Sequence, residues 1–135
     1  MMAYALLSLT FICALTALLL AAIGRRDPER TAERMDALRL LSLLFLYPAL
    51  VTLGVGIFVG AIWANVSWGR YWGWDPKEVW ALITMLIYSF ALHPGLLSVL
   101  RRPRPFHWFV LLAFLSVLFT YFGVNFLLGG LHSYA

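Results

Sequence analysis

Residues 68–80 read WGRYWGWDPKEVW, and this tryptophan segment separates two long apolar runs of the chain. It holds four of the six tryptophans together with four charged side chains. Residues 40–69 and 79–100, which extend from the two ends of the segment, carry no Asp, Glu, Lys or Arg. Each run reaches the roughly 20 residues that a helix needs to cross the hydrocarbon core of a membrane. The tryptophan segment is therefore expected to join two transmembrane helices.

The composition of the whole chain supports a membrane protein. Of its 135 residues, 63% are hydrophobic and only 12% are charged, which is more apolar surface than a soluble domain of this size can bury. Two further charge-free runs lie at 1–24 and 105–135. The pattern predicts an all-α, polytopic membrane protein with four transmembrane helices, at about 3–23, 40–64, 77–100 and 107–128. No positive charge precedes the first run, so a retained helix is expected there in place of a signal peptide.

The distribution of basic residues predicts the orientation. Eight arginines follow the first and third predicted helices, at 25, 26, 30, 34, 39, 101, 102 and 104, whereas only Arg70 and Lys77 lie between the second and third. Because basic loops stay in the cytoplasm, the tryptophan segment and both termini are expected on the outer side. The net charge of +4 is then a topology signal, and no nucleic-acid partner is expected.

The start of the third predicted helix has a clear capping pattern. Asp75 stands at the N-cap, Pro76 follows at the first helical position, and Glu78 comes three residues after the cap. This is a capping box with its favoured proline. It gives Asp75 and Glu78 a structural role that is preferred here to acid–base catalysis.

The tryptophans allow two interpretations. Aromatic side chains gather at membrane interfaces, which accounts for Trp63, Trp80 and Trp108. Trp68, Trp72 and Trp74 also alternate with glycines, which let a backbone approach a ligand whose flat face the rings can contact. A planar, apolar ligand such as a porphyrin would use both features. From the residues alone, the ligand and the interfacial belt remain open.

The single cysteine and the three histidines limit the chemistry. Cys13 alone cannot form a Cys-x-x-Cys-His haem attachment site, so covalent haem on this chain is not expected. His132 follows the fourth predicted helix on the side of the tryptophan segment, and His107 is expected at the opposite interface. His93 falls within the third predicted span, where an ionisable side chain is a functional candidate. No pattern of a hydrolytic triad or a phosphate-binding loop is present.

The stretch WGRYWGWDPKEVWALI resembles the tryptophan-rich WWD signature of the haem-handling proteins of cytochrome c maturation. GAIWAN before it, LIYSFALH after it and FGVNFLLGGLHSYA at the end resemble the CcsA/ResC type of system II in particular, as its C-terminal half. The similarity covers about 40–135, the expected haem-handling membrane domain. Residues 1–39 match only as a helix and a basic loop.

This resemblance implies a role in presenting haem b at the outer face of a bacterial inner membrane. There the haem vinyl groups are joined to the thiols of an apocytochrome Cys-x-x-Cys-His motif. Carried over by position, Trp68, Trp72, Trp74 and Asp75 match the WWD signature. His132 matches an outer axial ligand of the haem iron and His93 an intramembrane one. A ResB/CcsB-type membrane protein and the apocytochrome are the implied partners, within the lipid bilayer.

The chain also departs from the family pattern. The family's first outer histidine lies upstream of the WWD segment, but this chain has no histidine before position 93. We therefore expect no synthase activity from the chain alone, and expect a separate chain to supply the missing histidine and upstream helices. Two alternatives stay open: a structural membrane subunit that binds no haem, and a haem delivery protein without synthase activity.

Overall fold

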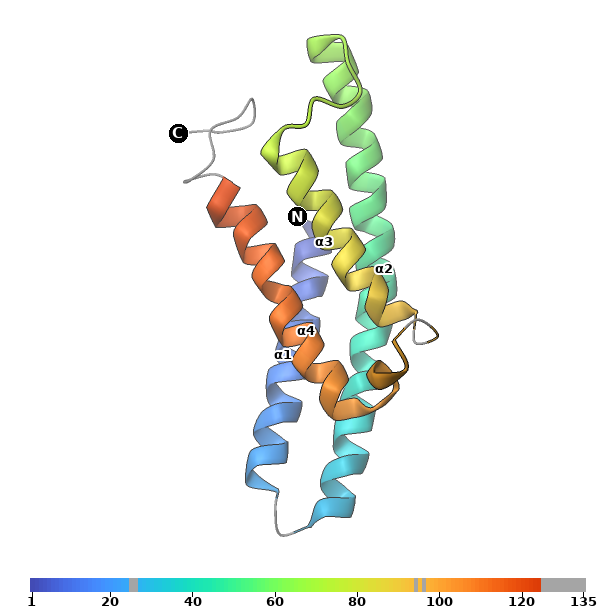
Figure 1. Ribbon diagram of the computed structural model, residues 1–135, viewed down its shortest axis with the longest axis vertical. Coiled ribbons are helices and arrows are strands. Elements are labelled where there is room, and N and C mark those ends of the chain that lie inside the picture. Colours follow the sequence, from blue (N-terminus) through green and yellow to red (C-terminus); the bar gives the residue numbers. More distant parts are fainter. Residues whose placement is uncertain (25–26, 94, 96, 125–135) are drawn as a thin grey trace.

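The computed structural model describes residues 1–24, 27–93, 95 and 97–124, and every regular element among them is helical (Figure 1). The helices are α1 (Met2–Ile23), α2 (Pro28–Trp68), α3 (Pro76–Leu92) and α4 (Pro103–Leu118). A short 3-10 helix, η1 (Ser98–Arg101), precedes α4, and a π-helical turn, η2 (Phe119–Gly123), follows it. The all-α prediction is confirmed for the described residues.

Three of these helical segments are long and apolar enough to cross a membrane: α1, α2 and α4 together with η2. The chain is thus a multi-pass membrane protein. The fourth predicted span, 107–128, corresponds to α4 and η2 as far as the described residues extend. The orientation of the chain and the total of four crossings stay predictions.

The predicted third span, 77–100, is too long. α3 has 17 residues and ends at Leu92, with His93 as its C-cap at φ −114° and ψ 68°. Proline follows at position 94 in the sequence, and a residue that precedes proline is disfavoured in the α-helical region. The apolar run therefore continues past the point at which the helix stops.

α2 is longer than the predicted membrane span of 40–64, because the polar segment before that span, predicted as a short amphipathic extension of the second helix, is helical from Pro28 onward. Its 41 residues correspond to about 60 Å at 1.5 Å per residue, roughly twice the hydrocarbon thickness. The helix starts early because Asp27 caps it, accepting a hydrogen bond from the Arg30 N–H at 3.2 Å, with Pro28 at the first position. α2 passes through residue 39 without a break, so the two regions distinguished by sequence similarity share one helix.

The four helices pack around a core of small and branched side chains. α1 and α2 run antiparallel from the Gly24 turn, where the Thr31 hydroxyl donates to the Gly24 carbonyl at 3.0 Å. Buried alanines let the backbones approach closely, as is common between membrane helices. The core cluster contains Leu7, Ala14, Leu46, Ala49, Tyr88, Ala91, Phe106, Val110, Ala113 and Val117.

α3 is joined to the end of α4 by a buried polar contact. The hydroxyls of Thr84 and Thr120 are 3.1 Å apart, and Thr120 also donates to the Ser116 carbonyl at 2.6 Å. Beside this contact, the rings of Trp80 and Phe119 lie with their centroids 4.2 Å apart. These contacts hold the first turns of α3, and the tryptophan segment that precedes them, against η2.

α1 covers only part of α2. The first turn of α1 lies next to Leu53, near the middle of α2, and α2 continues for several further turns to Trp68 (Figure 1). The upper part of α2 therefore faces α3 without α1 beside it. This offset leaves a groove directly below the tryptophan segment.

Candidate functional site

The tryptophan segment begins with a sharp helix end. Gly69 has φ +69° in the left-handed region, and its N–H donates to the Asn65 carbonyl at 2.8 Å, which ends α2 at Trp68. Glycine adopts this conformation without steric cost. The Trp68 ring meets the Trp63 ring edge-on, with centroids 4.9 Å apart. Trp68 therefore packs on the end of α2.

Trp72 and Trp74 form a second pair. Their rings are nearly perpendicular, at 89°, with centroids 6.0 Å apart. Trp72 is half-buried and lines the groove, whereas the Trp74 side chain is 77% exposed. Trp74 also has φ +56°, the only positive φ among the described non-glycine residues. Among the rings at 63, 68, 72 and 74, Trp63 contacts Trp68 and Trp72 contacts Trp74, and only Trp72 borders the groove.

The predicted capping box at the start of α3 is confirmed. Asp75 is buried, and its carboxylate accepts from the Lys77 N–H at 3.0 Å. Glu78 accepts in return from the Asp75 N–H at 3.3 Å. The same oxygen of Glu78, Oε2, also accepts from the Gly73 N–H at 2.8 Å. That last contact reaches beyond a capping box and ties the tryptophan segment to the first turn of α3.

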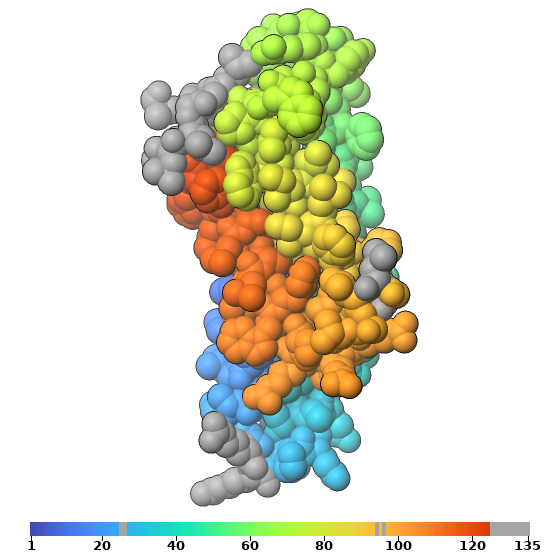
Figure 2. All heavy atoms as spheres, viewed as in Figure 1, coloured from blue at the N-terminus to red at the C-terminus, as the bar shows by residue number. Residues whose placement is uncertain are grey.

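The groove below the segment has a volume of about 830 Å³. Its walls are the first turn of α1, the upper part of α2, the start of α3 and η2, and they are mostly apolar. Among the described residues, nothing lies within 4 Å of the Cβ positions of Gly56 and Gly60, so the α2 wall of the groove is open at these two positions. The tryptophan segment itself contributes Trp72, Lys77 and Glu78 to the lining of the groove. In Figure 2 the side chains of this segment form the upper end of the molecule.

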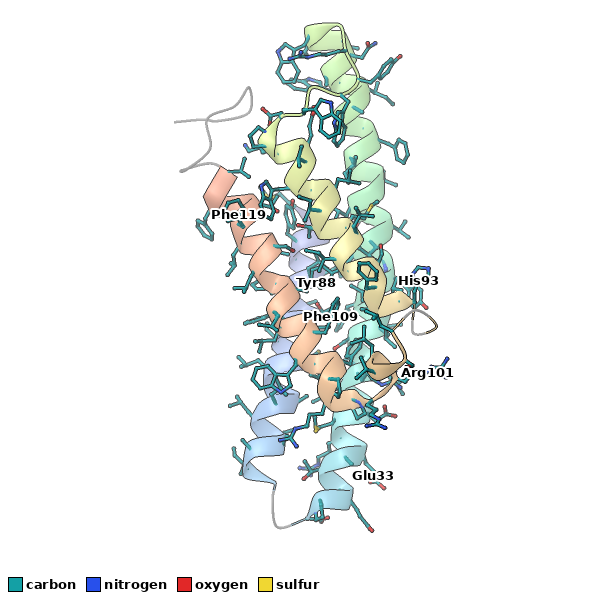
Figure 3. The ribbon with its side chains drawn as sticks, viewed as in Figure 1. Glu33, Tyr88, His93, Arg101, Phe109 and Phe119 are labelled. Carbon is teal, nitrogen blue, oxygen red and sulfur yellow. The ribbon has the colours of Figure 1, made fainter. Side chains whose placement is uncertain are left out.

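His93 lies at the opposite end of α3 from the tryptophan segment. Seventeen residues separate it from Pro76, which is about 25 Å along a helix axis. Its side chain is exposed and points away from the helix bundle (Figure 3). Its Nδ1 is 2.7 Å from the Ser89 carbonyl, which only accepts, so Nδ1 donates and Nε2 of the neutral ring carries the free lone pair. That tautomer suits a metal ligand, because a carbonyl partner on one nitrogen orients the other.

His107, a predicted interfacial residue, has a contact with α2 that the sequence did not predict. It is fully buried at the start of α4, and its Nε2 donates to the Met35 carbonyl of α2 at 2.9 Å. This contact fixes the first turn of α4 against α2. His132 lies outside the described residues. Among the described residues, the groove walls contain no histidine.

Two features of the site were not predicted from the sequence. The groove depends on the offset between α1 and α2, which no local pattern indicates. The bond from the Gly73 N–H to Glu78 depends on the path of the loop. The Glu at the third helical position does, however, signal that its carboxylate folds back toward the preceding chain.

Comparison with protein-family models matches residues 1–132 to the cytochrome c assembly protein family. Curated relatives agree. The chain is 55% identical over 86 residues to "Protein NrfI" of Wolinella succinogenes, covering 64% of this chain and 10% of that protein. It is 49% identical over 105 residues to "Cytochrome c biogenesis protein CcsA" of Gloeobacter violaceus, covering 76% and 29%.

A third relative covers almost the whole chain. The "Cytochrome c biogenesis protein CcsA" of Chlamydomonas reinhardtii is 37% identical over 131 residues, which is 97% of this chain and 37% of that protein. The chain therefore spans between a tenth and somewhat over a third of the length of these relatives. The resemblance to CcsA-type proteins that the tryptophan segment indicates is confirmed.

Proposed function

Because this chain belongs to the cytochrome c assembly protein family, and so takes part in cytochrome c biogenesis, we propose that it binds haem. In this proposal haem b lies in the groove below the tryptophan segment, with one edge presented at the outer membrane face. The haem is the substrate that is later joined to an apocytochrome. The chain acts in a bacterial inner membrane, with the tryptophan segment toward the periplasm or exterior.

The groove is the observation that carries this proposal. Its volume of about 830 Å³ falls within the roughly 300–1,000 Å³ of typical small-molecule sites. The walls are apolar, as a macrocycle requires, and a tryptophan ring borders one end. Trp72 is the residue assigned to contact the macrocycle face. Trp68, Trp74 and Asp75 are assigned supporting roles, Trp74 as the edge-on neighbour of Trp72 and Asp75 as the cap of α3.

The attachment reaction needs positioning more than acid–base chemistry. Each thiol S–H adds across one haem vinyl group, so a C–S bond forms, the vinyl double bond becomes single, and the hydrogen moves to carbon. No external oxidant is required. A fixed macrocycle edge lowers the entropic cost of bringing the thiols to it. Arg70 and Lys77, at the same end of the molecule, are the candidates to pair with haem propionates.

The axial ligands are assigned from the neutral imidazole chemistry of the histidines. His132 is the proposed outer ligand. His93, with Nε2 free to bind, is the proposed ligand for haem on its way outward. The outer site needs a second ligand, which we assign to another chain or to a segment of the longer relatives. A ResB/CcsB-type membrane protein and the apocytochrome are the proposed partners.

The absorption spectrum tests this proposal. The full chain is purified in detergent with any copurifying membrane partner, from cells that make haem. The wild type is expected to show a Soret band that Trp72→Ala weakens and His132→Ala removes or shifts. Trp108→Ala is the matched control and is expected to keep the band, because Trp108 lies near the start of α4, at the end away from the groove. A colourless wild type would overturn the haem proposal.

A structural subunit is the second candidate, and the open glycines favour it. Small residues such as Gly56 and Gly60 are typical of helix–helix contacts, and here no described residue lies within 4 Å of the Cβ position of either glycine. A helix from another part of the complex would fill the same groove. In that case the protein copurifies with its partner but stays colourless, and bulky residues at Gly60 break the complex.

A further inference from the structure

We propose that Glu78 is the positioning residue of the site: its carboxylate holds the tryptophan segment in the conformation that keeps Trp72 at the groove. The observation is that one oxygen, Oε2, accepts from two backbone N–H groups of the segment. These are the Gly73 N–H at 2.8 Å and the Asp75 N–H at 3.3 Å. The ligand in the groove is that of the proposed function, on which this inference rests for its binding test.

The two bonds enclose the residue with the least favourable backbone. Trp74 lies between Gly73 and Asp75 and has φ +56°. A bulky side chain in the left-handed region costs roughly 1–3 kcal/mol, and such strain persists only where the surroundings impose it. The Glu78 carboxylate grips the chain on both sides of Trp74, so it is the group that imposes this conformation.

The side chain of Arg70 limits the space beside the backbone at position 73. A Cβ at position 73 would lie 3.3 Å from Arg70 Nε, which is tighter than ordinary contact. Gly73 therefore lets the chain pass between Arg70 and Glu78. The backbone at 73 sets the direction of Trp72 before it and of Trp74 after it. Trp72 then faces the groove and Trp74 faces outward.

A residue that replaces Glu78 must supply one oxygen that accepts two hydrogen bonds. Both N–H groups converge on a single oxygen, and an amide carbonyl has two lone pairs. Glu78→Gln can therefore keep both bonds, although with a neutral acceptor. Glu78→Ala keeps neither. The exposed Glu33, near the start of α2 and far from the segment, is the matched control for loss of one carboxylate (Figure 3).

The position of Trp72 is tested directly by ¹⁹F NMR on the full chain labelled with 5-fluorotryptophan. The Trp72 resonance is identified by its loss in Trp72→Phe. In Glu78→Ala we expect the Trp72 and Trp74 resonances to move, with that of Trp108 unchanged. Glu78→Gln and Glu33→Ala are expected to keep the wild-type positions. A Trp72 resonance that does not move in Glu78→Ala overturns the inference.

Binding is tested by a double-mutant cycle with ferric haem. Glu78→Ala is expected to weaken haem binding about tenfold, the order expected when hydrogen bonds to a charged group are lost. In the Trp72→Ala background the same change is expected to have little further effect, because Glu78 acts through Trp72. Equal losses in both backgrounds would mean that Glu78 acts independently of Trp72, by stabilising α3 or by contacting the ligand itself, and would overturn the positioning role.

The two tests separate the two proposals. If the wild type binds no haem, the proposed function falls, and the ¹⁹F result alone decides whether Glu78 sets the position of Trp72. If haem binds but Glu78→Ala binds it as tightly as the wild type, the proposed function stands and the positioning role is overturned.

Discussion

Gly60 offers a perturbation with opposite effects on stability and on binding. It lies in α2 on the wall of the groove, and nothing lies within 4 Å of the position a Cβ would take. Replacing it with alanine therefore meets no steric barrier within the described part of the chain, and the ring of a phenylalanine would extend from the same open position. The new side chain instead occupies space that the proposed ligand needs.

The magnitudes follow from these facts. Glycine within a helix is less favourable than alanine by about 1 kcal/mol, so Gly60→Ala is expected to raise the stability by up to about that amount. A benzyl group in a filled groove acts as overpacking, which typically costs about 1–3 kcal/mol. For bound haem this corresponds to a roughly 5- to 150-fold rise in Kd.

The assay pairs thermal unfolding in detergent with haem titration followed at the Soret band. Gly60→Phe is expected to unfold at or above the wild-type temperature and to bind haem much more weakly. Val51→Phe is the matched control, because Val51 is exposed on α2 and does not border the groove. Haem binding by Gly60→Phe that equals the wild type would refute the placement of the ligand in the groove.

Three further changes test the parts of the site separately. Asp75→Ala removes the cap of α3 and is expected to lower the free energy of unfolding by about 1 kcal/mol, whereas Asp75→Asn keeps most of it, as measured by chemical denaturation in detergent. Gly69→Ala forces a Cβ into the left-handed region and is expected to cost about 1–2 kcal/mol; Gly69→Asn is expected to cost less, and equal losses would contradict a backbone origin. Thr84→Val removes the contact with Thr120 and is expected to lower the free energy of unfolding by about 0.6 kcal/mol. The loss in the Thr84→Val/Thr120→Val double variant is expected not to exceed the sum of the two single losses.

The sequence predicted the helical class and the site motif because both depend on local patterns. Charge-free runs locate the apolar helices, and the Asp-Pro-x-Glu pattern locates the start of α3, where both capping bonds are present. The start of α1 differs by one residue from the predicted 3–23. The resemblance to CcsA-type proteins rests largely on a contiguous stretch, and the comparisons confirmed it.

The error in the third predicted span arises because an apolar run need not be helical over its whole length. The run 79–100 is apolar throughout, but α3 ends at Leu92 because proline at 94 disfavours a helical His93. His93 is consequently an exposed C-cap at the end of α3, whereas the sequence placed it inside a helix. The early start of α2, twelve residues before the charge-free run, is not such an error: the polar segment at 25–39 is predicted as a short extension of this helix, and charged residues form helices well when a cap starts them.

The partners in contacts between distant residues could not be predicted: Thr120 is expected from the sequence to bond across helices, but only the fold identifies Thr84 as its partner. The bond from His107 Nε2 to the Met35 carbonyl joins residues 72 positions apart, and no local pattern indicates it. The groove likewise depends on how far α1 reaches along α2. The pairing of the rings, Trp63 with Trp68 and Trp72 with Trp74, likewise depends on the path of the loop.

The location of bound haem is the central claim, and paramagnetic broadening measures it most directly. The full chain, labelled with 5-fluorotryptophan, is loaded with ferric haem, and zinc protoporphyrin serves as the diamagnetic reference. The account predicts that ferric haem selectively broadens the Trp72 resonance, while the Trp108 resonance near the start of α4 stays sharp. A sharp Trp72 resonance in the haem-loaded protein, or broadening of Trp108 in its place, would contradict it.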